Sequence, residues 1–174
     1  MRRFVGIIGL GLWLAGFLAP AAQAQIVAFG ASNVAGRGVS LSEAFPAQLE
    51  AMLRAKGYPV TVTNAGVSGN GSGQMLARID QAVPEGTRVV ILDVGGGMWN
   101  NARLHVAYAV GVADFATMTA QLRARAIAVV DLYTNRNMPR AFIQADGIHL
   151  TAQGHHLLAS RLTPLVIAAL GGAK

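Results

Sequence analysis

The sequence predicts an α/β fold, a three-layer α/β/α sandwich around a parallel sheet of four to five strands. Two observations support this. Short apolar runs alternate along the chain with longer segments whose apolar residues recur at helical spacing, a pattern typical of a parallel sheet covered on both faces. The chain has 174 residues, 53% hydrophobic and 13% charged, which suits a single domain and excludes a disordered or coiled-coil protein.

Residues 1–24 have the three parts of a secretory signal peptide. Arg2 and Arg3 precede an uncharged apolar run, and the triplet Ala-Gln-Ala at 22–24 is a small-x-small cleavage site. The apolar run is shorter than the roughly 20 residues of a membrane-spanning helix, although an uncleaved anchor is the alternative. We therefore expect residues 25–174 to form one domain in the periplasm or outside the cell, with no stable membrane span after cleavage.

Two strands and one helix are expected in the first third of the chain. The apolar run at 26–29 ends at a glycine and predicts a buried strand. Apolar residues then recur at helical spacing over 42–57, where another glycine ends the predicted helix. Residues 59–63 alternate and are rich in β-branched side chains, as is typical of a strand.

The rest of the chain continues this alternation. A glycine- and serine-rich loop is expected at 64–73, and a short helix follows from about residue 74 until Pro84 stops it. An apolar strand at 88–94 is expected to be broken by the glycines at 95–97. The remaining elements are a helix, a strand and a final helix, at 112–126, 127–133 and 151–170. This order is that of a flavodoxin-like sheet.

Residues capable of acyl transfer follow these strands, at the sheet edge where parallel sheets bind ligands. Ser32 follows the first strand, glycine-rich loops follow the second and third, and Asp146 and His149 precede the last helix. A serine becomes nucleophilic when an imidazole accepts its proton, and a carboxylate orients that imidazole. The pattern predicts a Ser32, His149 and Asp146 triad. A turn serine and a helix-capping aspartate are the purely structural alternative.

These motifs resemble those of the GDSL or SGNH hydrolases, a family of esterases and lipases, and within it the secreted thioesterase and arylesterase branch. The matching segments are 26–32, 64–69 and 146–151, the last being the most specific. The resemblance implies an SGNH-hydrolase-like sandwich and an acyl-serine intermediate. It also implies an oxyanion hole that includes the backbone N–H groups of Ser32 and Gly69.

The chain departs from the family pattern at three places. Ala31 stands where the family usually has aspartate, a residue that the triad does not use. Gly97 stands where the family has the asparagine that donates to the oxyanion, so we expect Gly97 at the oxyanion hole and a slowed enzyme, with Asn100 or Asn101 as a candidate substitute donor. The stretch 97–146 is shorter than the family pattern by about one strand–helix unit of ~30 residues.

The sequence thus predicts a serine esterase that hydrolyses carboxylic ester or thioester bonds of small or lipid-like substrates, with no cofactor or metal. A degenerate, non-catalytic domain that binds acylated glycans or lipids is the alternative, and an acyltransferase is a third possibility. The absence of cysteine excludes a thiol nucleophile. The arginines are dispersed without interleaved aromatics, which argues against a nucleic-acid partner. The oligomeric state is not predicted.

Overall fold

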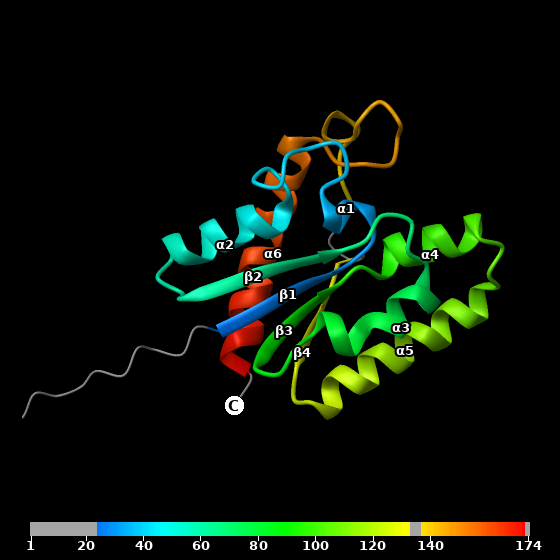
Figure 1. Ribbon diagram of the computed structural model, residues 1–174. Coiled ribbons are helices and arrows are strands. Elements are labelled where there is room, and N and C mark those ends of the chain that lie inside the picture. Colours follow the sequence, from blue (N-terminus) through cyan, green and yellow to red (C-terminus); the bar gives the residue numbers. More distant parts are fainter. Residues whose placement is uncertain (1–23, 133–136, 173–174) are drawn as a thin grey trace, which may run out of the picture.

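Four parallel strands form the sheet, in the order β2-β1-β3-β4 (Figure 1). The computed structural model describes residues 24–132 and 137–172. The strands are β1 (Ala24–Gly30), β2 (Val60–Gly66), β3 (Thr87–Leu92) and β4 (Ala128–Asp131). All three pairings are parallel, and β1 lies between β2 and β3. The predicted α/β sandwich is confirmed with four strands. Residues 1–23 of the predicted leader and Tyr133, the predicted end of the last strand, lie outside the described residues.

Helices cover both faces of this sheet, and alternate residues of β1 show how (Figure 1). Ile26 and Ala28 face the layer that contains the helices α2 (Phe45–Ala55) and α6 (Ala152–Gly172). Val27 and Phe29 face the opposite layer, and all four of these strand residues are fully buried. The opposite layer contains the helices α3 (Ser72–Ala82) and α5 (Tyr108–Ala124). This two-sided burial explains why β1 is apolar throughout instead of alternating with polar residues.

The strand predicted at 88–94 ends at Leu92, before the glycines as expected. The glycines at 95–97, however, do not form the expected loop, because they lie in a helix, α4 (Val94–Arg103). The side chain of Asp93 accepts a hydrogen bond of 2.8 Å from the backbone N–H of Gly96 and so caps the new helix. A Cβ atom on Gly97 would lie 2.6 Å from the ring of Phe115 in α5. Gly97 therefore allows α4 to approach α5 closely, because any larger residue at this position would collide with Phe115.

Smaller differences lie at the ends of elements. β2 continues to Gly66, into the segment expected to be a loop, and α5 starts at Tyr108, four residues earlier than expected. Two short elements were not predicted, namely α1 (Ser32–Ala35) and the 3-10 helix η2 (Arg140–Phe142). The first begins at Ser32, and the second lies shortly before Asp146.

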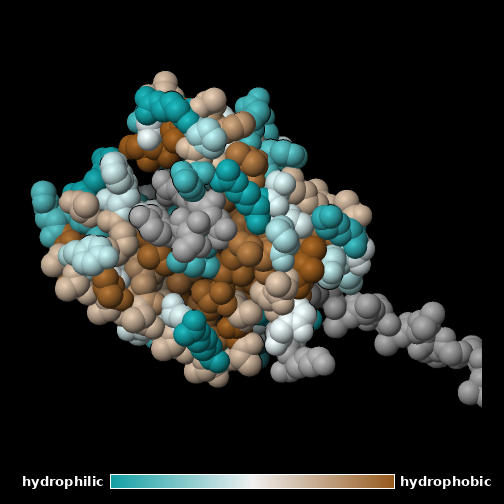
Figure 2. Space-filling view, turned by 180° about the vertical axis from the view of Figure 1, so that it is seen from behind, coloured by the Kyte–Doolittle hydropathy of each residue, from teal (hydrophilic) through white to brown (hydrophobic). Residues whose placement is uncertain are grey.

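The surface carries apolar side chains among polar ones, as the low charged fraction of the sequence leads one to expect. Figure 2 views the molecule from behind and shows apolar residues gathered near the middle of that face, with hydrophilic residues around its periphery. Among the helices of residues 24–132 and 137–172, none combines the length and the apolar content needed to cross a membrane.

Candidate active site

The nucleophile position lies in a tight turn between β1 and α1. A Cβ atom on Gly30 would collide with the Cβ atom of Asp93, so the last residue of the strand must be glycine. The backbone N–H of Ala31 donates to a carboxylate oxygen of Asp93 at 3.3 Å. Asp93 is fully buried and also caps α4, so one carboxylate joins this turn to the start of that helix. Ser32 follows as the first residue of α1.

A second turn, between η2 and α6, carries the predicted acid and base. One carboxylate oxygen of Asp146 accepts hydrogen bonds from the backbone N–H groups of Ile148, at 2.9 Å, and His149, at 3.0 Å. The other oxygen, Oδ2, contacts Nδ1 of the His149 imidazole. The hydrogen bonds from the imidazole and from the two backbone groups lower the pKa of Asp146 well below its usual range. Asp146 is therefore ionised at neutral pH.

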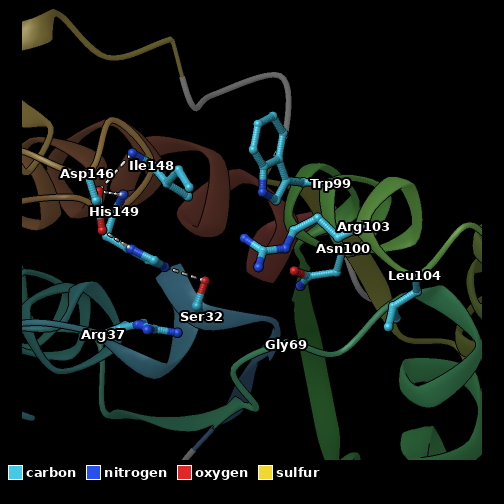
Figure 3. Close-up of a pocket in the computed structure, with 10 residues that line it drawn as sticks. All are labelled: Ser32, Arg37, Gly69, Trp99, Asn100, Arg103, Leu104, Asp146, Ile148 and His149. Atoms are coloured by element: carbon cyan, nitrogen blue, oxygen red, sulfur yellow. Dashed lines mark hydrogen bonds and ion pairs between the residues drawn. The ribbon is translucent and has the colours of Figure 1, made fainter.

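The two turns bring Ser32, His149 and Asp146 into one hydrogen-bonded chain (Figure 3). Nε2 of His149 lies 2.9 Å from Oγ of Ser32, and its Nδ1 lies 2.6 Å from Oδ2 of Asp146. The side chain of His149 is 10% exposed, whereas that of Asp146 is 44% exposed. An imidazole placed between a hydroxyl and a carboxylate in this way can accept the hydroxyl proton and hold it as an imidazolium.

A buried asparagine that the sequence did not point to joins the two turns. Oδ1 of Asn33 accepts a hydrogen bond of 3.0 Å from the backbone N–H of Leu150, and its Nδ2 donates to the carbonyl oxygen of Ile148 at 3.4 Å. Asn33 is 3% exposed. Because it is adjacent to Ser32, and because Ile148 and Leu150 flank His149, Asn33 fixes the distance between nucleophile and base.

Gly69 lies at the site, in the loop between β2 and α3 (Figure 3). Its φ of +86° is one that side-chain-bearing residues rarely adopt, so this turn requires glycine. Ser32 is the first residue of α1, and its N–H therefore has no acceptor within that helix. Both N–H groups predicted for an oxyanion hole thus belong to residues that line the cavity.

The structure does not bring Gly97 to the site. Gly97 is buried within α4 against Phe115 and Met75, and its N–H donates to the carbonyl oxygen of Asp93 at 3.4 Å. The expectation that Gly97 takes part in an oxyanion hole therefore has no support in this geometry. Because of its three consecutive glycines, this segment was not predicted to be a helix. Within the helix, Gly97 faces the core.

The two asparagines considered as substitutes have different surroundings. Asn100 lines the cavity, and its Nδ2 donates to the carbonyl oxygen of Asn70 at 2.9 Å. Asn101 is 2% exposed and bonds to Ser72, whose N–H donates to Oδ1 at 2.8 Å and whose Oγ accepts from Nδ2 at 2.7 Å. Only Asn100 is therefore placed to meet a substrate.

The triad opens into a cavity of about 430 Å³. Its lining combines the triad, two arginines and several apolar side chains: Ser32, Arg37, Gly69, Trp99, Asn100, Arg103, Leu104, Asp146, Ile148 and His149. The sequence did not indicate the arginines, Leu104 or Ile148 as lining residues. Arg103 would have been predicted as a lining residue if the sequence had indicated a helix over 94–103. Residues three and four apart share one helical face, and Arg103 follows Asn100 by three positions and Trp99 by four.

Comparisons with known proteins agree with this geometry. The model of the GDSL-like Lipase/Acylhydrolase family matches residues 28–142, about two thirds of the chain. No curated protein sequence gave a significant match.

Several solved structures share the fold. TesA is 22% identical over 84% of this chain and 99% of its own, with a TM-score of 0.74. The psychrotrophic esterase EstA from Pseudoalteromonas sp., solved inhibited by monoethylphosphonate, is 13% identical over 86% of this chain and 100% of its own, with a TM-score of 0.73. AlinE4, an SGNH-hydrolase family esterase, is 25% identical over 87% of this chain and 99% of its own, with a TM-score of 0.62. With its family model, its fold and its motifs in agreement, the chain belongs to the GDSL-like lipase/acylhydrolase family.

Proposed function

We propose that the protein is a serine esterase that works in the periplasm or outside the cell and hydrolyses carboxylic ester or thioester bonds through an acyl-serine intermediate. The hydrogen-bonded chain Ser32–His149–Asp146 carries this proposal. The family supports ester hydrolysis in general, and the structural neighbours EstA and AlinE4 are described as esterases. The signal-like sequence of residues 1–24 supports export.

In the first half of the reaction, Oγ of Ser32 attacks the carbonyl carbon of the ester while Nε2 of His149 accepts the hydroxyl proton. The 2.9 Å separation of these atoms permits direct transfer. Asp146 holds the imidazole by its Nδ1 and stabilises the positive charge that forms on the ring. The resulting tetrahedral intermediate carries a negative charge on the former carbonyl oxygen.

This oxyanion needs hydrogen-bond donors on the side of Ser32 away from His149. The backbone N–H groups of Ser32 and Gly69 are two, and we assign Asn100 as the third. The amide of Asn100 has two N–H bonds, of which the contact with Asn70 uses one. Figure 3 shows its side chain pointing into the cavity from α4, opposite His149. Loss of such a donor typically lowers turnover by about 10²–10³.

In the second half, the proton on His149 passes to the leaving alcohol or thiol as the bond to the acyl carbon breaks. A water molecule then gives its proton to His149 and attacks the acyl group on Ser32. Collapse of the second tetrahedral intermediate releases the carboxylic acid and returns the proton to Oγ. A cavity of about 430 Å³, with Trp99, Leu104 and Ile148 in its wall, fits a small or moderately lipid-like ester.

The test is to label the purified protein with a fluorophosphonate probe and to measure hydrolysis of short p-nitrophenyl esters. A phosphonate probe is a sound choice because the similar EstA was solved inhibited by a phosphonate. We expect labelling and hydrolysis in the wild type, and loss of both in Ser32→Ala. Ser160→Ala, in an exposed position of α6, is the matched control and should retain both. Ester hydrolysis that persists in Ser32→Ala would refute the mechanism, and a wild type that neither labels nor hydrolyses would favour a binding domain.

A further inference from the structure

Two arginines enter the catalytic cavity, although the ester chemistry described above uses neither. Figure 3 shows Arg37 and Arg103 entering from opposite sides, with Ser32 between them in this view. Within residues 24–132 and 137–172, neither guanidinium forms a hydrogen bond or an ion pair. Other arginines of the same part of the chain do so, for example Arg54 with Glu50 at 3.1 Å.

The backbone of Arg37 is fixed between the two catalytic turns. Its N–H donates to the carbonyl oxygen of Ser32 at 3.0 Å. Its carbonyl oxygen accepts a hydrogen bond of 2.9 Å from the side chain of Gln144, which also donates to the carbonyl oxygen of Leu150 at 2.7 Å. The backbone of Arg37 is therefore held by Ser32 in one catalytic turn and, through Gln144, by Leu150 at the other.

Arg103 is positioned by the helix α4. It lies one turn after Trp99 and Asn100, so the three side chains share the face of α4 that lines the cavity. Trp99 is 53% exposed and Leu104 is 47% exposed. The same wall of the cavity thus presents a large apolar surface together with a positive charge.

The cavity has an excess of positive charge. Among the described residues that line it, Asp146 is the one acidic residue, and its carboxylate is hydrogen-bonded to His149. Two guanidinium groups remain without a counter-charge, and a guanidinium matches the paired oxygens of a carboxylate or a phosphate. A neutral ester would leave both charges unused.

We propose that the physiological substrate is an anionic ester, in which a carboxylate or phosphate group beyond the scissile carbonyl binds to Arg37, Arg103 or both, while an apolar portion contacts Trp99 and Leu104. This inference rests on the proposed esterase function and narrows its substrate class. Both arginines are largely exposed, so water and salt screen their charge. We expect each to contribute a preference of about two- to fivefold, within the range of exposed ion pairs.

The test uses two pairs of aryl esters that differ in one terminal group. Mono-(4-nitrophenyl) adipate and its methyl ester place the charge on the acyl side, whereas 4-acetoxybenzoate and methyl 4-acetoxybenzoate place it on the leaving group. The measured quantity is the ratio of kcat/KM for the anionic ester to that for its neutral partner. Comparing this ratio between variants removes the intrinsic difference in reactivity within each pair.

We expect Arg37→Gln or Arg103→Gln to lower this ratio about two- to fivefold for at least one pair, and the double variant to lower it further. Arg123→Gln removes the same charge from an exposed position near the end of α5, outside the cavity lining, and should leave the ratio unchanged. In the wild type, the ratio should also fall as the ionic strength rises from about 0.01 M to about 1 M.

A ratio that is the same in the wild type, the single variants and the double variant for both pairs would overturn the inference and leave the esterase function intact. Hydrolysis of none of the four esters by the wild type would overturn the esterase function and the inference together. Phosphorylated aryl esters of the same design then distinguish phosphate from carboxylate recognition by the same ratio.

Discussion

The side chain of Asn33 accepts a hydrogen bond of 3.0 Å from the backbone of Leu150, 117 positions further along the chain. Asn33 follows the serine and Leu150 follows the histidine of the triad, so this one contact connects the two catalytic turns. It lies in the interior, where a lost partner leaves a polar group unsatisfied. The catalytic geometry is therefore supported by a residue that takes no part in the chemistry.

We predict that Asn33→Ala destabilises the protein by about 1–3 kcal/mol, because it leaves the buried N–H of Leu150 without an acceptor. We also expect kcat to fall more than KM changes, since the distance between Ser32 and His149 is no longer fixed. Chemical denaturation and steady-state kinetics measure these effects. Gln121→Ala, which removes an exposed amide from α5, is the control. An unchanged free energy of unfolding and an unchanged kcat in Asn33→Ala would show that the contact with Leu150 supports neither the fold nor the catalytic geometry.

The neighbouring Asn100 and Asn101 should behave differently when each is replaced by alanine. Asn100→Ala is expected to lower kcat about 10²–10³-fold with little effect on folding, because it removes a proposed donor to the oxyanion. Asn101→Ala is expected to lower the free energy of unfolding by about 1–3 kcal/mol, because Ser72 loses two buried hydrogen bonds. Each variant serves as the control for the other. Equal kcat in Asn100→Ala and the wild type would remove Asn100 from the oxyanion hole.

Introducing the asparagine of the family pattern at position 97 should not increase kcat. The new Cβ atom would lie 2.6 Å from the Phe115 ring and 3.0 Å from the sulfur of Met75, so Gly97→Asn and Gly97→Ala are both expected to destabilise the protein. The cost of such overpacking is about 1–3 kcal/mol. In the control Gly73→Ala, the nearest atom to the new Cβ is 3.9 Å away, and stability should stay the same or rise slightly. A faster Gly97→Asn enzyme would contradict the placement of Gly97 in the core.

Stability should fall on acidification because of a second buried histidine, His155. It packs against Phe45, whose N–H donates to Nδ1 at 3.2 Å, and its Nε2 has no partner among the described residues. Burial lowers the pKa of His155 to about 4, despite the attraction of the Glu43 carboxylate. Between pH 6.5 and 4 the unfolded chain binds a proton that the folded protein does not. The contribution of His155 is thus full above pH 6.5 and lost as the pH falls towards 4.

The expected loss in the free energy of unfolding is about 3 kcal/mol, from the difference between the pKa of 6.5 in the unfolded chain and about 4 in the folded protein. Urea denaturation from pH 4 to pH 7 measures it, and His155→Gln should show a flatter pH dependence than the wild type. His156→Gln provides the matched control, because His156 is exposed and bonds to Gln48 on the surface. Parallel pH profiles for the wild type and His155→Gln would refute the assignment.

The sequence by itself determined the class of the fold and the three residues of the proposed triad. Apolar periodicity is a local property, and it placed the four described strands and the four long helices α2, α3, α5 and α6 within a few residues of their observed ends. The spacing of Asp146 and His149 is also local, since both lie in one turn. That Asp146 and His149 lie close to Ser32 could be predicted because the carboxyl ends of parallel strands meet at one edge of the sheet.

Tertiary structure alone decided what surrounds the triad. Local propensity predicts that three consecutive glycines form a loop after the strand, but capping by Asp93 and the packing of Gly97 against Phe115 place them in the first turn of α4. The same helix turned Gly97 into the core and brought Asn100 and Arg103 to the cavity. Arg37 and Asn33 reach the site through contacts with residues more than a hundred positions away. Such contacts depend on how helices and loops pack in three dimensions, which no local pattern of residues encodes.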